Sequence, residues 1–254
     1  MFSVGASHFP IEKLPVKRIS VIIPAYDEED YLPTTLQHIA NALAAVACPS
    51  EVIVVDNDSH DRTRQIAESL RARVVLENEH NISRVRNTGA RHTTGDVLIF
   101  IDADTLVPET LFEKMVAVLA NDRCLGGAVG VTYERPVRKW MTPYLSGWKF
   151  WARVFNMKQG AVQFCRKSSF EALGGYDETI FVGEDIEFYW RLSKLASRND
   201  GYLELIEHPK VTTSARRFDK MSLWKALLFT HPIFIRLTWQ KKSVWKDWYE
   251  EAVR

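Results

Sequence analysis

The chain has 254 residues, 46% hydrophobic and 26% charged, which is typical of a folded protein that buries a core. Its 33 basic and 32 acidic residues leave a net charge of +1, so no global attraction for nucleic acid is expected. No apolar run reaches the length of about eighteen residues that a membrane span needs, and the N-terminus lacks a signal-peptide core, so we expect a cytoplasmic protein.

The first half of the chain alternates short apolar runs with helical patterns. The runs are rich in β-branched residues and predict strands covered on both faces, at 19–24, 51–55, 73–77 and 97–101. The helical patterns begin after Asp30, which can cap the first helix, and recur over about 63–71 and 83–93. Alternating strands and helices favour right-handed βαβ units, so the sequence predicts an α/β fold with a mainly parallel central sheet flanked by helices.

The second half has a different pattern. Between predicted strands at 125–134 and 160–167, aromatic residues recur at helical spacing: Trp140, Tyr144, Trp148, Trp151 and Phe155. This stripe is typical of a helix packed on the core, and the alternative is an interfacial helix on anionic lipid or around a lipid-like acceptor. We also expect a helix over about 185–195, strands near 202–206 and 210–214, and aromatic-rich C-terminal helices.

Acidic residues follow three of the predicted strands. Asp27 and Glu28 follow the first strand, Asp56 the second, and Asp102 and Asp104 the fourth. Because parallel α/β sheets bind ligands at the carboxyl ends of their strands, we expect these side chains to share an active site. Asp56 can accept the imide hydrogen of a uracil or the equivalent edge of another base.

Asp102 and Asp104 can share a hard divalent cation that keeps positions open for phosphate oxygens. The alternative is a solvated turn in which Asp104 or Thr105 caps the next helix, which we expect near Pro108. The turn after Asp56 has a similar alternative, in which Asp58 or Asp61 caps a helix.

Other candidate residues lie on predicted helix and strand ends. Arg84, Arg86 and Arg91 lie on the helix before the acidic pair, where they can meet phosphate or ribose or form a solvated face. Glu184 and Asp185 begin a helix, where a carboxylate can act as general base or merely favour the helix dipole.

Basic residues near the second half's strands provide further candidates. Arg216 and Arg217, just past a strand, can clamp a diphosphate or lie exposed. His208 can complete a metal shell, although a lone histidine is more often structural.

Six blocks of sequence, taken in order, resemble the family 2 glycosyltransferases of GT-A fold. They are VIIPAYDEEDYLPTTL, VIVVDNDSHDRT, RVRNTGA, IDADT, GAVQFCRKSSFEALGGYDE and GEDIEFYWRL, and together they cover about residues 18–217. The resemblance implies a Rossmann-like GT-A catalytic domain over 1–217, with a nucleotide-binding half at about 18–107 and an acceptor-binding half at about 108–217. Residues 218–254 would form a helical extension packed on it or at a membrane surface.

The resemblance also implies roles for single residues. The nucleotide would contact one set: Pro24, Ala25, Tyr26, Glu28, Asp56, Arg86, Asp102 and Ala103. Asp104 would be the principal ligand of Mg²⁺ or Mn²⁺, with Asp102 shared between metal and ribose. Asp185 would be the general base, Gly174, Gly175 and Glu184 would lie on the acceptor side, and Arg216 and Arg217 would meet the diphosphate.

The activity implied is an inverting transfer of a sugar from a UDP-sugar, or alternatively from a GDP- or dTDP-sugar. The acceptor would be a glycan, a small molecule or a lipid-linked carrier, the last with peripheral contact at the inner face of the membrane. The alternatives are a sugar-1-phosphate nucleotidyltransferase, whose glycine-rich N-terminal loop is absent here, and a catalytically inactive nucleotide-sugar-binding protein. Two positions depart from the family pattern, because Asn57-Asp58-Ser59 replaces Asp-Gly-Ser and Asn81 replaces a glycine.

Overall fold

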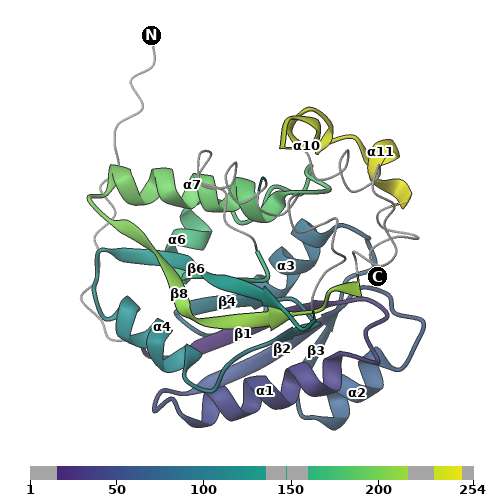
Figure 1. The fold of residues 1–254 in the computed structure, drawn as a ribbon, viewed down its shortest axis with the longest axis horizontal. Helices are drawn as coiled ribbons and strands as arrows, with labels where there is room; N and C mark the ends of the chain where they lie inside the picture. The colour runs from purple at the N-terminus through teal and green to yellow at the C-terminus, as the bar shows by residue number, and fades with distance from the viewer. Residues whose placement is uncertain (1–15, 136–146, 148–159, 217–231, 248–254) are drawn as a thin grey trace.

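The computed structural model describes residues 16–135, 147, 160–216 and 232–247 (Figure 1). The strands of these residues join in one eight-stranded sheet with the order β3-β2-β1-β4-β7-β6-β8-β5. The predicted aromatic stripe at 140–155 and most of the predicted tail lie outside the described residues. No helix within the described ranges combines the length and the apolar character that crossing a bilayer requires.

The first half of the sheet is parallel, as predicted. It contains β1 (Ile19–Ala25), β2 (Ser50–Asp56), β3 (Arg73–Leu76) and β4 (Val97–Ile101). Ala25 pairs with Asp56 and Asp56 with Leu76, so these strands end at one edge of the sheet. Every residue of β1 and β4 is buried, so these two strands are covered on both faces. This accounts for the lack of alternating polar residues in their sequences.

The connecting helices are α1 (Leu32–Ala44), α2 (Thr63–Ser69) and α3 (Ile82–Arg91). The predicted cap at Asp30 is wrong: Tyr31 is the N-cap of α1, and the N–H groups of Tyr31 and Leu32 donate to the Glu28 carbonyl. A backbone turn therefore satisfies the donors that we assigned to the Asp30 side chain.

The second half adds antiparallel pairing. Its strands are β5 (Thr105–Leu106), β6 (Cys124–Tyr133), β7 (Val162–Arg166) and β8 (Tyr202–Thr213). β7 runs antiparallel to both β4 and β6, whereas β8 runs parallel to β6. The strands predicted at 202–206 and 210–214 are one strand, because Pro209 lies in a stretch where β8 bulges away from β6 rather than in a break.

The helices of the second half are α4 (Leu111–Leu119), α6 (Lys167–Ala172), α7 (Glu184–Arg198), α10 (Pro232–Thr238) and α11 (Lys242–Asp247). The alternative in which Asp104 or Thr105 caps a helix is excluded, since Thr105 belongs to β5 and α4 has Thr110 as its N-cap. The sheet continues through Thr105 because that residue pairs with Thr213 of β8.

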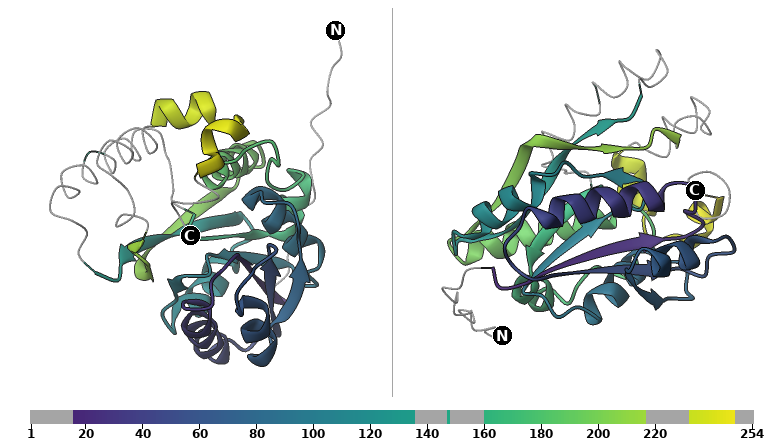
Figure 2. Two further views of the ribbon diagram at one scale, coloured as in Figure 1. Left: turned by 90° about the vertical axis from the view of Figure 1, so that its right-hand side faces the viewer. Right: turned by 90° about the horizontal axis from the view of Figure 1, so that it is seen from below.

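Two apolar layers hold the helices to the sheet (Figures 1 and 2). One layer joins the sheet to α1 and α4 through Leu36, Ile39 and Phe112, and the other joins its opposite face to α3, α6 and α7. Helix α3 lies especially close to the sheet: a Cβ on Gly89 would lie 2.4 Å from Cγ2 of Ile22. This close approach brings the side chains of α3 to the carboxyl edge of the strands.

Candidate active site

The predicted acidic residues lie at the carboxyl edge of the parallel strands. Asp56 is the last residue of β2, Asp102 follows β4 directly, and Glu28 follows β1 by three residues. Two arginines connect this edge to elements from the second half of the chain: Arg86 of α3 and Arg216 beyond β8. The fold therefore places residues far apart in sequence in one candidate site.

Asp56 is buried at the end of β2, and its Oδ1 accepts the Ser59 N–H at 3.1 Å. The Asn57 N–H donates to the Ala25 carbonyl at 2.8 Å, which fixes the turn against β1. Asp58 has a φ of 62°, in the left-handed region that Asp tolerates better than most residues. Asp58 therefore adopts a conformation that a glycine at this position would also allow.

Aromatic rings lie beside this turn. The Tyr26 ring meets the His80 ring edge-on at 4.9 Å between centroids and the His60 ring at 6.0 Å. Pro24 and Ala25 are buried in β1, so Tyr26 is the first of the predicted nucleotide residues to extend beyond the strand. Sequence reasoning missed both histidines, because they belong to different loops that only the folded sheet brings together.

The acidic pair after β4 faces two different cations. Oδ1 of Asp102 accepts a hydrogen bond from Nη2 of Arg86 at 2.9 Å. Asp104 accepts one from the Thr213 hydroxyl at 3.2 Å, and its Oδ2 lies 3.4 Å from Nη2 of Arg216. Ala103, between them, is buried, and its carbonyl accepts the Thr35 hydroxyl at 2.7 Å. The turn is thus anchored to α1 while its two carboxylates point to separate partners.

Glu28 and Asp104 both contact the same arginine, Arg216. Nη2 of Arg216 donates to Oε1 of Glu28 at 2.5 Å, and the Arg216 guanidinium lies 4.4 Å from the centroid of the Tyr31 ring. Burial raises the pKa of Glu28 to about 7, against the lowering effect of Arg216 and with further raising by Asp104 and Asp102. Oε2 of Glu28 is buried and has no hydrogen-bond partner among the described residues.

Asp185 lies in the first turn of α7, after Gly183, which adopts a left-handed φ of 80°. Its Oδ1 accepts the Ile186 N–H at 2.8 Å, and its carbonyl accepts Nε2 of Gln163 at 2.9 Å. Gly160 packs directly against it, because a Cβ there would lie 2.3 Å from the Asp185 Cβ. Gln163 and Gly160 carried no sequence signal that connected them to Asp185.

Charge and burial together set the acidity of Asp185. Burial, as the largest cause, and the neighbouring Glu184 carboxylate both raise the pKa of Asp185 and Arg86 lowers it, which together give a pKa of about 7. A carboxyl group with this pKa is about half ionised at pH 7, and it is basic enough to take a proton from a hydroxyl in a reaction.

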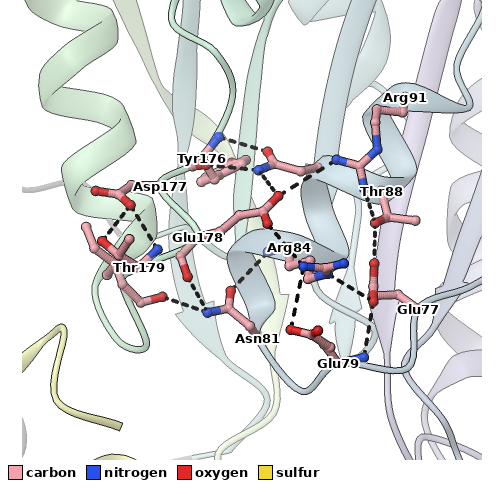
Figure 3. A network of polar contacts seen from close by, with 12 residues as sticks. Glu77, Glu79, Asn81, Arg84, Thr88, Arg91, Tyr176, Asp177, Glu178 and Thr179 are labelled. Carbon is pink, nitrogen blue, oxygen red and sulfur yellow. Dashed lines mark hydrogen bonds and ion pairs between the residues drawn. The ribbon is translucent and has the colours of Figure 1, made fainter.

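Arg86 is the one of the three α3 arginines that reaches the site. Its Nη1 bonds the buried Glu184 and its Nη2 bonds Asp102. Burial alone would lower the pKa of Arg86, but Glu184 and Asp102 raise it, so the guanidinium stays charged. Arg84 and Arg91 instead form ion pairs with Glu178, at 3.7 and 3.8 Å (Figure 3).

Gly174 and Gly175 form a turn that holds the following segment to α3. Both have a left-handed φ, of 71° and 77°, and a Cβ on Gly175 would lie 2.5 Å from Oδ1 of Asn87. Asn87 accepts the Tyr176 N–H at 2.8 Å and donates to the Tyr176 carbonyl at 2.9 Å. Asn81 caps α3 by accepting the Arg84 N–H at 3.0 Å, which the family's glycine could not do.

Carboxylate oxygens of the kind that Asp102, Asp104 and Glu28 offer are the ligands that Mg²⁺ and Mn²⁺ prefer. Oε2 of Glu28 is buried without a hydrogen-bond partner among the described residues, so this carboxyl group has an oxygen available for a cation. Within the described ranges, no three His, Cys, Asp or Glu side chains are arranged to hold a metal by themselves.

His208 is exposed within β8 and belongs to no such group, so the structure does not bring it to the acidic pair. Arg217 lies outside the described residues.

Residues 20–174, more than half of the chain, match the family described as Glycosyl transferase family 2. This chain belongs to glycosyl transferase family 2. The family 2 chain is 33% identical over 110 residues to an undecaprenyl-phosphate 4-deoxy-4-formamido-L-arabinose transferase of Klebsiella pneumoniae, a match covering 41% of this chain and 34% of that protein. It is 28% identical over 154 residues to a dolichol-phosphate mannosyltransferase of Pyrococcus furiosus, covering 59% and 40% respectively.

Among solved structures, the chain resembles glucosyl-3-phosphoglycerate synthase from Mycobacterium tuberculosis in complex with Mn²⁺, UDP and glucosyl-3-phosphoglycerate. The TM-score is 0.58 at 18% identity, over 88% of this chain and 80% of that one. The expected GT-A fold is therefore confirmed. The family 2 chain spans only a third to two fifths of the length of the curated relatives it matches, at 34% and 40%.

Proposed function

We propose that this family 2 chain transfers a sugar from a nucleotide sugar to an acceptor hydroxyl, with inversion at the anomeric carbon. One observation carries the proposal: Arg86 contacts both Asp102, at the end of β4, and Glu184, beside Asp185. This contact supports the proposal that the acidic pair and the candidate base act in one site, from opposite halves of the fold. A metal site on one side and a base on the other suit direct displacement of the nucleoside diphosphate by the acceptor hydroxyl.

On the donor side we propose a UDP-sugar. Asp56 is buried at the end of β2, paired with Ala25, the residue before Tyr26, and its carboxylate can accept the imide N–H of uracil. Guanine and thymine also offer N–H donors, so GDP- and dTDP-sugars are the alternatives that binding measurements must separate.

We propose that Asp104 and Asp102 hold Mg²⁺ or Mn²⁺, with water and diphosphate oxygens as the remaining ligands. When bound, the cation would neutralise the charge that develops on the departing nucleoside diphosphate. Arg216 already lies beside Asp104 and can contribute a second positive charge toward the same phosphates. The synthase structure that this chain resembles contains both Mn²⁺ and UDP, which agrees with this proposal.

On the acceptor side we propose that Asp185 removes the proton of the attacking hydroxyl. Its pKa of about 7 suits this role, since the base form is populated at neutral pH while proton affinity remains. We propose a lipid-linked acceptor at the cytoplasmic surface of a membrane. Both relatives described above, the Klebsiella and the Pyrococcus transferases, carry the name of a lipid phosphate. A soluble glycan or small molecule is the alternative acceptor.

The proposal can be tested with a thermal-shift panel of UDP-, GDP- and dTDP-sugars, each with and without Mn²⁺. A ligand that binds only the folded state raises the melting temperature, so the true donor should give a Mn²⁺-dependent rise. Absence of such a rise with every nucleotide sugar would contradict the proposal.

Two substitutions then separate the proposed roles. Asp185→Asn should keep the Mn²⁺-dependent shift and lose turnover by about a hundredfold or more, as expected when a general base is removed. Asp104→Ala should lose the metal-dependent shift as well. A wild-type chain that binds donor but never turns it over would favour the inactive nucleotide-sugar-binding alternative.

A further inference from the structure

Arg86 occupies a position that links the two sides of the site. Its side chain extends from α3. One guanidinium nitrogen contacts Asp102, directly after β4, and the other contacts Glu184, at the start of α7. The Arg86 side chain is 5% exposed, against 34% for Asp102 and 10% for Glu184. The pair between Arg86 and Glu184 is deeply buried and therefore little screened by solvent, whereas the pair with Asp102 is partly exposed.

A second set of contacts runs from the same helix to Asp185 itself. The Arg86 guanidinium lies 5.4 Å from the centroid of the Tyr176 ring. The Tyr176 hydroxyl donates to Oε1 of Gln163 at 3.1 Å, and Nε2 of Gln163 donates to the Asp185 carbonyl at 2.9 Å. The backbone of Tyr176 is in turn held by Asn87, the residue after Arg86. Helix α3 therefore supports the start of α7 by two routes, one ionic and one through neutral hydrogen bonds.

We propose that Arg86 is a positioning residue for the general base: its planar fork fixes Glu184 relative to Asp102, and so places the Asp185 carboxylate opposite the metal site. This inference deepens the proposed function and rests on it. The resemblance alone assigned Arg86 a contact with the nucleotide. The structure adds a link from the donor side to the base side, which requires the two-ended geometry of arginine and which lysine cannot reproduce.

The charges around Asp185 make this link measurable. Among the described residues, the charged groups that act on it are Glu184 on its own helix, Arg86 from α3 and Asp102 after β4. The Tyr176 hydroxyl interacts with Arg86, Glu184 and Asp185. Arg86 favours the ionised form of Asp185, whereas Glu184 opposes it. Removing one member of the pair should therefore move the titration of Asp185 in a direction set by which member is lost.

The experiment compares Glu184→Gln, Arg86→Met and the double variant with the wild-type chain, using Arg91→Met as the matched control. Arg91 is on the same helix but is exposed and pairs with Glu178. Two quantities are measured: the titration of the Asp185 carboxyl carbon by ¹³C NMR, assigned with Asp185→Asn, and the Kd for UDP with Mn²⁺. The pH dependence of kcat follows once a donor is turned over.

We expect Glu184→Gln to lower the pKa of Asp185 and Arg86→Met to raise it, with the double variant between them. Glu184→Gln should reduce kcat about tenfold or more while the Kd for UDP changes less than about threefold, because it disturbs base placement and not donor binding. Arg91→Met should change none of these quantities. Arg86→Lys should not restore kcat, because a single ammonium cannot hold both carboxylates.

Shifts of the same sign in the two single variants, or no shift in either, would overturn the proposal. If Arg86→Met does not fold, Glu184→Gln and the double variant still decide the matter, because they leave no unpaired carboxylate at Glu184. If the expected NMR shifts occur but no donor is ever turned over, the charge link is supported and the transferase proposal fails, so the two failures are distinguishable.

Discussion

At the scale of single residues, burial controls the chemistry of this site. Glu28 and Asp185 lie in different halves of the fold, yet burial is the largest cause that raises the pKa of each to about 7. Their counter-ions, Arg216 and Arg86, each connect one of these regions to the acidic pair after β4. The acidity of the site therefore depends on two arginines as much as on its carboxylates.

The raised pKa of Glu28 predicts a pH dependence of stability. The pKa of Glu28 is about 7 in the folded state and 4.5 for an ordinary glutamate. Between these pH values the folded state therefore binds more protons than the unfolded state. The free energy of unfolding should thus fall as pH rises through this window, by on the order of 3 kcal/mol from this group. Urea denaturation at pH 5 and pH 8 should show that Glu28→Gln flattens the decline; an unchanged decline would disprove this assignment.

Gly160 predicts an effect on catalysis without an effect on donor binding. A Cβ at this position would lie 2.3 Å from the Asp185 Cβ, so Gly160→Ala must displace the proposed base. We expect kcat to fall by about a hundredfold, since small misplacements of a catalytic group have effects of that order. The Kd for UDP should stay within about threefold of wild type.

Gly130→Ala in β6, where the nearest atom to an added Cβ is the Glu207 carbonyl oxygen at 3.2 Å, provides the control for Gly160→Ala. Equal loss of kcat in both variants would mean that Gly160 has no special relation to Asp185.

At the scale of elements, α3 supports the loop that leads to the proposed base. The loop between Gly174 and Gly183 contacts α3 through Asn81, Asn87 and Arg84, and Figure 3 shows the contacts of Asn81 and Arg84. Tyr176 and Ile180 of this loop are buried, so the loop keeps its shape through apolar packing as well as through its hydrogen bonds to a rigid helix. The order of α7 at its first turn therefore depends on α3.

Asn87→Ala should destabilise the fold measurably. It removes the hydrogen bonds to the Tyr176 N–H and carbonyl and to the Glu178 carboxylate, and it leaves buried backbone groups unsatisfied. We expect the free energy of unfolding to decrease by about 2–4 kcal/mol in urea titrations. Gln37→Ala, which loses an exposed bond to Asn41, should change it by less than about 0.5 kcal/mol. A comparable loss in the two variants would argue against a supporting role for Asn87.

At the scale of the whole molecule, the described C-terminal helices pack beside the start of α7 (Figures 1 and 2). The Phe181 N–H donates to the Trp239 carbonyl at 2.7 Å, and Gln240 donates to the Thr179 hydroxyl at 2.9 Å. Trp245 is fully buried, and its Nε1 donates to the Thr238 carbonyl at 2.9 Å. We propose that this extension stabilises the loop before Asp185 from the side opposite to α3.

Trp245→Ala should weaken this packing. We expect a loss of about 3–5 kcal/mol of local stability, as for other buried aromatic residues, and faster hydrogen exchange at the Phe181 amide. Exchange at the Ile22 amide, within β1, should change much less. Unchanged protection of the Phe181 amide would mean that the extension does not depend on Trp245.

The sequence by itself determined the parallel half of the sheet, the family and the nomination of Asp56, Asp102, Asp104 and Asp185. Buried strands and amphipathic helices each have a characteristic spacing of apolar residues, which a short stretch of sequence reveals. The acidic residues follow those strands directly. The merged strand β8 and the backbone cap at Glu28 were missed, because pairing across the sheet overrides local signals such as Pro209.

Only the tertiary structure decided which charges meet. It selected Arg86 over Arg84 and Arg91, brought Arg216 to Glu28 and Asp104, and placed Gly160 and Gln163 against Asp185. These contacts join residues far apart along the chain, and the energy of a charge pair depends on distance and burial rather than on sequence separation. No local pattern carries that information.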